Sequence, residues 1–292
     1  MEWIHRNVSY WLVEHPVVRD FEWKEGETWG SSPKFTATAV ITYLSIVGIL
    51  HKAYLSTKSM TKTLPTTSSP PPFIRLLTAA HSLFLVVLSL IMALGCILST
   101  IAQKPNNRWI FCFPYGTRPR GPVFFWFYVF GLSKVVEFMD TLLIILGKSK
   151  RRLTFLHVYH HTITALMTPL GFRAPMSLIP IAMVTNCSVH VLMYTYYMLC
   201  ALGRRPWWKR LVTDIQIVQF ILSFLVSAVM LWYHFMGDGC TGFPIWCISA
   251  VISASFLALF LDFRTKNYSS GRSTVRGGQK KEDNKGEQEK EN

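Results

Sequence analysis

Charged residues are scarce in this 292-residue chain: Asp, Glu, Lys and Arg make up 16% of it, against 50% hydrophobic and 14% aromatic residues. A soluble domain of this size rarely combines so little charge with long apolar runs. The scarcity therefore excludes an ordinary soluble domain and indicates a polytopic membrane protein.

Apolar windows of about 20 residues, the length that crosses a bilayer as a helix, predict seven transmembrane helices. They cover residues 36–55, 76–101, 122–146, 153–172, 176–201, 211–235 and 242–263. We expect an all-α polytopic membrane fold with a lumenal amino-terminal segment over residues 1–35, a seven-helix transmembrane catalytic domain over 36–263 and a disordered basic cytosolic tail over 264–292.

The first 30 residues lack a clean signal peptide, because polar residues and Pro16 interrupt the apolar run and no basic stretch precedes a small-residue cleavage site. We expect residues 1–18 to form an interfacial helix carrying Trp3, Tyr10 and Trp11 instead.

Acidic residues are fewer still, 16 against 30 Lys and Arg, which leaves a formal net charge of +14. The basic residues are divided among short loops, so they do not form the single stripe typical of nucleic-acid binding, and we expect no nucleic-acid partner. The excess of Lys and Arg after the third and fifth spans places these loops and the tail in the cytosol and the amino terminus in the lumen. The second lumenal loop is also basic, and its charge argues against this orientation.

Cysteine is sparse as well: of the six, four fall within predicted spans, where we expect them to pack as small apolar residues. Cys112 and Cys240 fall in two loops that are both assigned to the lumen. Because that compartment is oxidising, we predict a disulfide between them. Two unrelated loop cysteines remain the alternative, since connectivity is not deducible from sequence alone.

What the chain does contain is a histidine cluster, His157, His160 and His161, within the apolar residues 153–168. This spacing puts all three imidazoles on one face of a helix. A buried polar group at membrane depth costs several kcal/mol unless it is paired. Three such groups on one face therefore favour a functional site over structural histidines that only form hydrogen bonds with their neighbours. Imidazole serves either as a metal ligand or as a base, acid or acyl-accepting nucleophile.

Three other predicted spans contain polar residues at helical spacing. They are Lys134, Glu137, Asp140 and Thr141 in the third, Asn186, His190, Tyr194 and Tyr197 in the fifth, and Thr213, Asp214, Gln216 and Gln219 in the sixth. Mutual neutralisation of Lys134 and Glu137 is one alternative to a site, and interhelical hydrogen bonding by the glutamines is another.

Depth favours a single site. Counted from the cytosolic ends at about 1.5 Å per residue, the polar groups lie about 10 to 17 Å into the membrane. The residues used in this count are Asp140, His160, His190 and Gln216. Their common level predicts one polar chamber that opens toward the cytosol.

Two other functions compete for this chamber. A membrane di-iron desaturase or hydroxylase also carries HxxHH, but it draws ligands from several histidine boxes. Only nine histidines are present, and five of them stand apart: His5, His15, His51, His81 and His234. A seven-helix transporter or receptor would favour repeats and helices interrupted by Gly or Pro, which the sequence does not show.

Four motifs occur in order: Lys134-x-x-Glu137-x-x-Asp140-Thr141, His157-x-x-His160-His161, Asn186-x-x-x-His190-x-x-Met193-Tyr194-x-Tyr196-Tyr197 and Thr213-x-x-Gln216-x-x-Gln219. Together they resemble the motif set of the ELO family of very-long-chain fatty acid elongases. The segment around residues 11–16 and 25–28 resembles plant-type members. The tail lacks the clean dilysine retrieval signal that is common in the family.

The resemblance implies a very-long-chain 3-oxoacyl-CoA synthase of the endoplasmic reticulum membrane, which condenses a long acyl-CoA with malonyl-CoA to give 3-ketoacyl-CoA, CO2 and CoA. It implies seven transmembrane helices, six of them enclosing a narrow tunnel closed at the lumenal end, in a membrane-lipid setting. It implies no metal or prosthetic group, with NADPH serving a partner ketoacyl-CoA reductase. A 3-hydroxyacyl-CoA dehydratase, an enoyl-CoA reductase and a homodimer are further implied partners, and sphingolipid synthesis is an implied use of the product.

Within that reaction we assign roles as a hypothesis. His160 is the nucleophile that forms an acyl-imidazole, His157 and His161 share proton transfer and orientation, and Asp140 or Glu137 fixes their tautomers. His190 binds the second thioester or the malonyl carboxylate. The expected substrate-binding residues are Asn186, Lys134, Tyr194, Tyr197, Thr213, Gln216 and Gln219 in the chamber, with Lys148, Lys150, Arg151, Arg152, Arg204 and Arg205 attracting CoA phosphates at its mouth.

Overall fold

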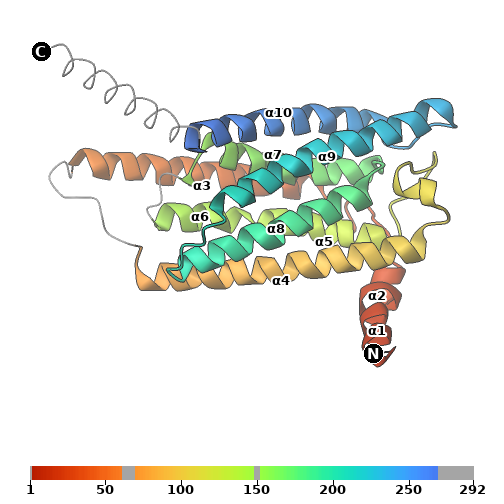
Figure 1. Ribbon diagram of the computed structural model, residues 1–292, viewed down its shortest axis with the longest axis horizontal. Coiled ribbons are helices and arrows are strands. Elements are labelled where there is room, and N and C mark those ends of the chain that lie inside the picture. The colour runs from red at the N-terminus through yellow and green to blue at the C-terminus, as the bar shows by residue number, and fades with distance from the viewer. Residues whose placement is uncertain (1, 61–69, 148–151, 269–292) are drawn as a thin grey trace, which may run out of the picture.

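The computed structural model describes residues 2–60, 70–147 and 152–268, which form a bundle of helices (Figure 1). In order these are α1 (Glu2–Ser9), a π-helical turn (Tyr10–Glu14), α2 (Pro16–Arg19), α3 (Pro33–Met60), α4 (Pro72–Gln103), a 3₁₀ turn (Asn107–Ile110), α5 (Pro122–Val136), α6 (Phe138–Leu146), α7 (Phe155–Arg173), α8 (Ile179–Ala201), α9 (Lys209–Met236) and α10 (Phe243–Tyr268). Extended structure in these ranges is limited to an isolated bridge between Glu22 and Arg120. The predicted all-α fold is confirmed.

Four helices in the described part of the chain are long and apolar enough to cross a membrane: α3 over Pro33–Lys52, α4, α9 and α10. The other three predicted spans coincide with α5 plus α6, with α7 and with α8. The first of these is divided because the helix breaks at Glu137, and the other two carry the histidines, amide and tyrosines of the candidate site. The tail predicted from residue 264 begins inside α10, and its residues 269–292 lie outside the described ranges.

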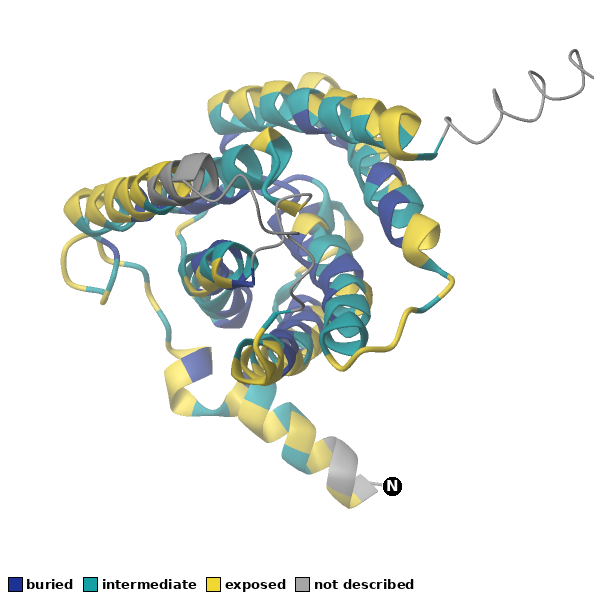
Figure 2. Ribbon diagram, turned by 90° about the vertical axis from the view of Figure 1, so that its left-hand side faces the viewer, coloured by how far each residue is buried: buried dark blue, intermediate teal, exposed yellow. Residues whose placement is uncertain are grey.

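Helix α4 lies along α8 and also contacts α5 and α6, whereas α3 packs on α6 and α7, and α10 packs on α9 and α7 (Figure 1). Figure 2 shows that the helices on the outside of the bundle keep exposed faces. Those faces are apolar, as at Leu225 of α9, which is 63% exposed, and Val251 of α10, which is 72% exposed. Exposed apolar residues of this kind are what lipid-facing helices present.

The start of α7 is fixed by a side-chain cap. Oγ1 of Thr154 accepts a hydrogen bond from the backbone N–H of His157 at 3.2 Å. Such a cap satisfies one of the free N–H groups of the first helical turn. The helix therefore begins just before the first histidine, and all three imidazoles lie in its first two turns.

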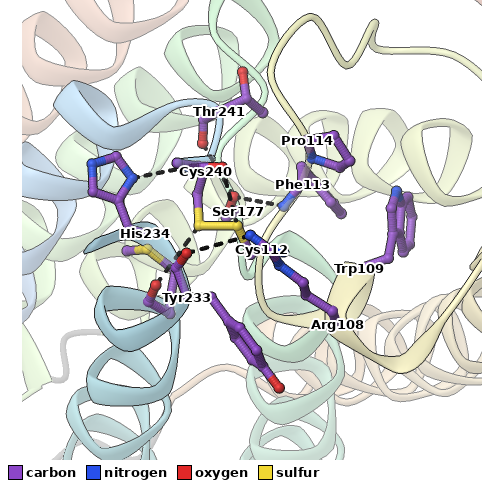
Figure 3. The surroundings of a disulfide bond; sticks show 12 residues. Arg108, Trp109, Cys112, Phe113, Pro114, Ser177, Tyr233, His234, Cys240 and Thr241 are labelled. Atoms are coloured by element: carbon purple, nitrogen blue, oxygen red, sulfur yellow. Dashed lines mark hydrogen bonds between the residues drawn. A yellow bond between two sulfur atoms is a disulfide. The ribbon is translucent and has the colours of Figure 1, made fainter. Parts of the chain in front are cut away.

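The disulfide predicted between Cys112 and Cys240 is present at one end of the bundle (Figure 3). Beside it, Oγ of Ser177 accepts from the N–H of Phe113 at 3.0 Å and donates to the carbonyl of Thr241 at 3.1 Å. The N–H of Thr241 in turn donates to the carbonyl of Phe113 at 2.8 Å. The α4–α5, α7–α8 and α9–α10 connections are thus tied to one another.

The amino-terminal segment packs against this same end. The indole N–H of Trp126 on α5 donates to the carbonyl of Leu12 at 2.9 Å. Arg173, at the end of α7, donates to both carboxylate oxygens of Glu25 at 2.6 and 3.1 Å. These hydrogen bonds hold the pKa of the Glu25 carboxyl below its usual range.

Candidate functional site

The carboxylate of Glu137 lies at the centre of the candidate site, at the break between α5 and α6, and is 1% exposed. Nζ of Lys134 is 2.7 Å from it, Nδ1 of His190 is 3.5 Å away and Nδ1 of His161 is 3.9 Å away. The neutralising pair that the sequence offered as an alternative is present, but the same carboxylate also faces two histidines. Glu137 is therefore the group that links α7 and α8.

The polar residues of α5 and α6 match those of α8 one for one. Lys134 donates to Asn186 at 3.5 Å, Glu137 faces His190, and Asp140 accepts from the hydroxyl of Tyr194 at 2.7 Å. Successive polar residues are three positions apart on α5 and α6 but four positions apart on α8.

Local geometry accounts for part of this difference. The N–H of Glu137 bonds to the carbonyl of Ser133 at 2.8 Å, as in an α-helix, whereas the N–H of Asp140 bonds to the carbonyl of Glu137 at 3.0 Å, an i to i+3 bond of 3₁₀ type. A 3₁₀ turn rises about 2.0 Å per residue against about 1.5 Å in an α-helix, so the step from Glu137 to Asp140 is lengthened toward the four-residue step from His190 to Tyr194.

The three histidines of α7 point to different neighbours. Nε2 of His157 is 2.9 Å from Oγ1 of Thr141, which is in turn 3.0 Å from the hydroxyl of Tyr43 on α3. His161 turns toward Glu137. The imidazoles of His157 and His161 are thus directed toward Thr141 of α6 and the buried Glu137 carboxylate.

His160 has different surroundings. Its ring centroid lies 5.1 Å from that of Phe256 on α10 and 5.4 Å, edge-on, from that of His161. Among the described residues, its hydrogen bonding outside the helix ladder is confined to its carbonyl, which accepts from Thr164. Within the described part of the chain, neither the His160 ring nor the His161 ring makes a hydrogen bond, and His160 differs in being half-buried where His161 is buried.

Asp140 does not contact the histidines of α7. Its Oδ1 lies 3.1 Å from Nε2 of His81 on α4, and its Oδ2 accepts from Tyr194. The expectation that His81 stands apart is therefore wrong. Helix α4 runs against both α6 and α8, and His81 reaches their polar residues from within an apolar span, which was a sequence signal in its own right.

The remaining chamber candidates are less closely connected. Nε2 of Gln216 on α9 lies 3.5 Å from the sulfur of Met193 on α8, one turn beyond His190. Thr213 is buried and Gln219 is half-buried on the same helix. Tyr197 packs edge-on to Tyr194 at a centroid distance of 6.0 Å. The fifth and sixth predicted spans thus do meet beside the histidines.

Three of the expected rim residues, Lys148, Lys150 and Arg151, lie outside the described ranges. Arg152, Arg204 and Arg205 are exposed, and the guanidinium of Arg152 lies 5.6 Å from the ring centroid of Tyr197.

Sequence reasoning missed Arg75. It is exposed near the start of α4, and its Nε donates to the carbonyl of Ala201 at 3.1 Å. Arginine therefore gathers at this end of the bundle from α4 and from the connections that precede α7 and follow α8.

Metal-ligand groups and an apolar cleft are two further features to compare with the candidate site. Within residues 2–60, 70–147 and 152–268, no group of three or more His, Cys, Asp and Glu side chains is arranged to hold a metal ion. An apolar cleft between α3, α5 and α7, lined by residues such as Val40, Leu132 and Phe172, contains none of the candidate site residues.

Comparison with known proteins places these motifs in context. The family model described as "ELO: GNS1/SUR4 family" matches residues 28–276. The chain is 27% identical over 277 residues to fatty acid elongase 3-like of Arabidopsis thaliana, covering 90% of this chain and 92% of the relative. It is 37% identical over 199 residues to fatty acid elongase A of Dictyostelium discoideum, with 64% and 70% covered, and 38% identical over 162 residues to very long chain fatty acid elongase 1 of Mus musculus, with 52% and 56% covered.

Proposed function

The chain belongs to the ELO family and is a condensing enzyme of fatty acid elongation, and we propose that it joins a long-chain acyl-CoA to malonyl-CoA through an acyl group carried on His160. It is thus an acyltransferase, a 3-oxoacyl-CoA synthase of a membrane lipid pathway. The observation that supports the proposal is the His160 ring, which is half-buried, has no protein hydrogen-bond partner among the described residues and lies edge-on to the buried His161 that faces Glu137.

The first half-reaction transfers the acyl group. A ring nitrogen of neutral His160 attacks the thioester carbonyl, the carbon–sulfur bond breaks, and the proton lost from the acylated imidazole goes to the departing CoA thiolate. His161, edge-on to His160, and the Glu137 carboxylate behind it are positioned to hold that proton in transit.

The second half-reaction makes the carbon–carbon bond. Malonyl-CoA loses CO2, and the electron pair left on its C2 attacks the acyl carbon. The carbon–nitrogen bond breaks, and the imidazole regains a proton from the solvent. His190 and Asn186 bind the malonyl unit, and Gln216 and Gln219 donate to the carbonyl oxygens on which charge develops. The contacts of His190 with Glu137, of Asn186 with Lys134 and of Gln216 with Met193 support these roles.

The arrangement of the two ends supports a seven-span topology. We propose that α5 with α6, α7 and α8 cross the membrane alongside α3, α4, α9 and α10, and that six of the seven spans enclose the acyl chain. The disulfide lies at one end, and the group of Arg75, Arg152 and Arg204 lies at the other. An endoplasmic reticulum membrane with the disulfide in the lumen and the arginines in the cytosol satisfies both.

The proposed chemistry draws on the chain's own side chains, with acyl-CoA and malonyl-CoA as substrates. NADPH belongs to the ketoacyl-CoA reductase that consumes the product. A 3-hydroxyacyl-CoA dehydratase and an enoyl-CoA reductase complete each elongation cycle, and we include both among the proposed partners, with a homodimer as the proposed assembly. Sphingolipid synthesis is a proposed use of the product.

The test uses purified protein, a saturated acyl-CoA and labelled malonyl-CoA. We expect 3-ketoacyl-CoA without added metal or NADPH, and we expect His160→Ala to lower kcat by at least about 1,000-fold, as removal of a nucleophile does. With acyl-CoA alone, intact-mass spectrometry should show an added acyl group on the unmodified chain but not on His160→Ala. His51→Gln, a change at an exposed histidine of α3, is the matched control.

Two outcomes would overturn parts of this proposal. Turnover that survives His160→Ala removes His160 as the nucleophile. Complete loss of activity on chelation, restored by iron, would favour the di-iron alternative instead.

A further inference from the structure

We propose that His81 of α4 is a positioning residue for the condensation, acting on His190 through Asp140 and Tyr194. The proposal rests on the proposed function of the histidine chamber. It assigns a role to a residue that lies outside the four motifs and on a helix that contributes none of them.

Three contacts carry the proposal. Nε2 of His81 lies 3.1 Å from Oδ1 of Asp140. The hydroxyl of Tyr194 donates to the other oxygen of the same carboxylate at 2.7 Å. The Tyr194 ring is fully buried and packs edge-on to His190, with 5.4 Å between the ring centroids.

The carboxylate needs both neighbours. The side chains of His81 and Asp140 are 11% and 13% exposed, so Asp140 is shielded from most of the solvent that would stabilise its charge. A carboxylate in such a place is retained when donors surround it. Tyr194 supplies one donor, and the imidazole of His81 is the group placed to supply the second.

The contact between His81 and Asp140 is close but not aligned. Nε2 of His81 is buried and makes no hydrogen bond to any described residue, although Oδ1 lies at hydrogen-bonding distance. Catalytic hydrogen bonds in ligand-free enzymes are often misaligned and tighten when substrate binds. We therefore place the alignment of His81 with Asp140 at the step in which the second substrate enters beside His190.

The consequence is a chain of support that crosses three helices. His81 holds Asp140, Asp140 holds the Tyr194 hydroxyl, and the Tyr194 ring fixes the face of His190. His190 is thereby held toward Glu137, 3.5 Å away. Loss of His81 should then slow turnover without weakening the binding of substrate.

The first experiment measures kcat and KM of purified variants with saturating acyl-CoA. His81→Leu and His81→Asn, whose side chains lack a donor at the position of Nε2, should lower kcat about 10- to 100-fold, the usual effect of losing an orienting partner. KM for malonyl-CoA should stay within about twofold. His81→Gln places an amide N–H near the lost Nε2 and should retain about a third of kcat or more. His51→Gln should match the unmodified chain.

The second experiment repeats these changes in an Asp140→Asn background. If His81 acts through Asp140, His81→Leu should cause no further loss there, since residues in one hydrogen-bonded network are not additive. An equal fold-loss in both backgrounds would overturn the proposal, as would a His81→Leu kcat within about twofold of the unmodified value.

The asparagine variant guards against a folding defect caused by an apolar side chain, because it keeps a polar group at the site, whereas the leucine variant keeps nearly the volume of histidine. An unmodified chain that forms no 3-ketoacyl-CoA would refute the proposed function itself. An active unmodified chain with an unaffected His81→Leu variant refutes this inference alone.

Discussion

A lysine and a glutamate with 1% exposure each lie at the centre of the site, and neither is stable there alone. Their charged atoms are 2.7 Å apart. Removing one member of such a pair leaves an uncompensated buried charge, which costs about 3–5 kcal/mol, whereas removing both charges is often nearly neutral.

Lys134→Met should therefore lower the thermal midpoint of the purified protein strongly, by an amount corresponding to about 3 kcal/mol or more. The double variant Lys134→Met, Glu137→Gln should recover most of that stability. It should remain inactive, because Glu137 also faces His161 and His190. Thermal unfolding followed by tryptophan fluorescence, together with the elongation assay, measures both effects.

Lys266→Met is the matched control. Lys266 pairs with Asp262 at 2.8 Å, but the two side chains are 73% and 52% exposed, and exposed pairs contribute little. If Lys134→Met destabilised the protein no more than Lys266→Met, the prediction that an unpaired Glu137 strongly destabilises the fold would be wrong.

The residue-scale predictions from sequence succeeded where spacing on one helix decided the outcome. The step from Lys134 to Glu137 predicts their pairing, and the steps through Asn186, His190 and Tyr194 predict their common face. The partner of Asp140 was not predictable in the same way. His81 comes from a helix with no other polar signal of this kind, and only the packing of α4 against α6 and α8 brings the two together.

At the scale of elements, the described side chains of α3 reach the site through one polar connection. The hydroxyl of Tyr43 lies 3.0 Å from Oγ1 of Thr141, and that oxygen lies 2.9 Å from Nε2 of His157. The Tyr43 ring stacks on Phe138 of α6, with centroids 4.1 Å apart, and this stacking fixes the position of the Tyr43 hydroxyl. Helix α3 therefore positions a histidine without contributing one of the four motifs.

Thr141→Val should lower both stability and activity, because it leaves the partly buried Nε2 of His157 without a partner, at a cost of about 1–3 kcal/mol. Thr141→Ser keeps the hydroxyl and should retain most of the activity. Tyr43→Phe leaves the bond between Thr141 and His157 intact, so its effect should be the smaller. Initial rates and thermal midpoints of the three variants check this order, and a Thr141→Val enzyme as active as Thr141→Ser would contradict it.

The elements themselves were largely predictable, since apolar length indicates a helix wherever the run is continuous. The break between α5 and α6 was not, because Lys134 to Thr141 reads as one uninterrupted helical pattern. Residues 134–141 contain no Gly or Pro, and the break is marked by the 3₁₀-type bond between Asp140 and Glu137. Such a break leaves no local signal in the sequence.

At the scale of the whole molecule, the two ends of the bundle differ in chemistry. One end has the disulfide and three interlinked connections, and the other has Arg75, Arg152 and Arg204. Arginines at the end opposite the disulfide suit a substrate that carries phosphates at one terminus and an acyl chain at the other, although Arg108 lies beside the disulfide (Figure 3). The orientation inferred from loop charge and cysteine placement stays a prediction.

The disulfide itself is tested by counting thiols. Denatured protein kept from reductant should react with a maleimide-polymer at four cysteines, Cys96, Cys187, Cys200 and Cys247, and reduction should add the two of the disulfide. Cys112→Ser with Cys240→Ser should give four labels under both conditions. The bond closes a sequence separation of 128 residues, so its loss should also lower thermal stability, by about 2–4 kcal/mol.

Orientation follows from a second measurement on the same end. Tyr115→Asn creates an acceptor sequon, with Thr117, in the exposed loop that precedes α5. Asn7→Gln is combined with it to remove the natural Asn-Val-Ser sequon that begins at Asn7. If the loop is lumenal, this double variant should gain an endoglycosidase-sensitive glycan. Asn267, which begins a natural Asn-Tyr-Ser sequon at the opposite end of the bundle, should stay unmodified. A glycan on Asn267 would invert the proposed orientation and move the arginine-bearing end, with its access for CoA substrates, away from the cytosol.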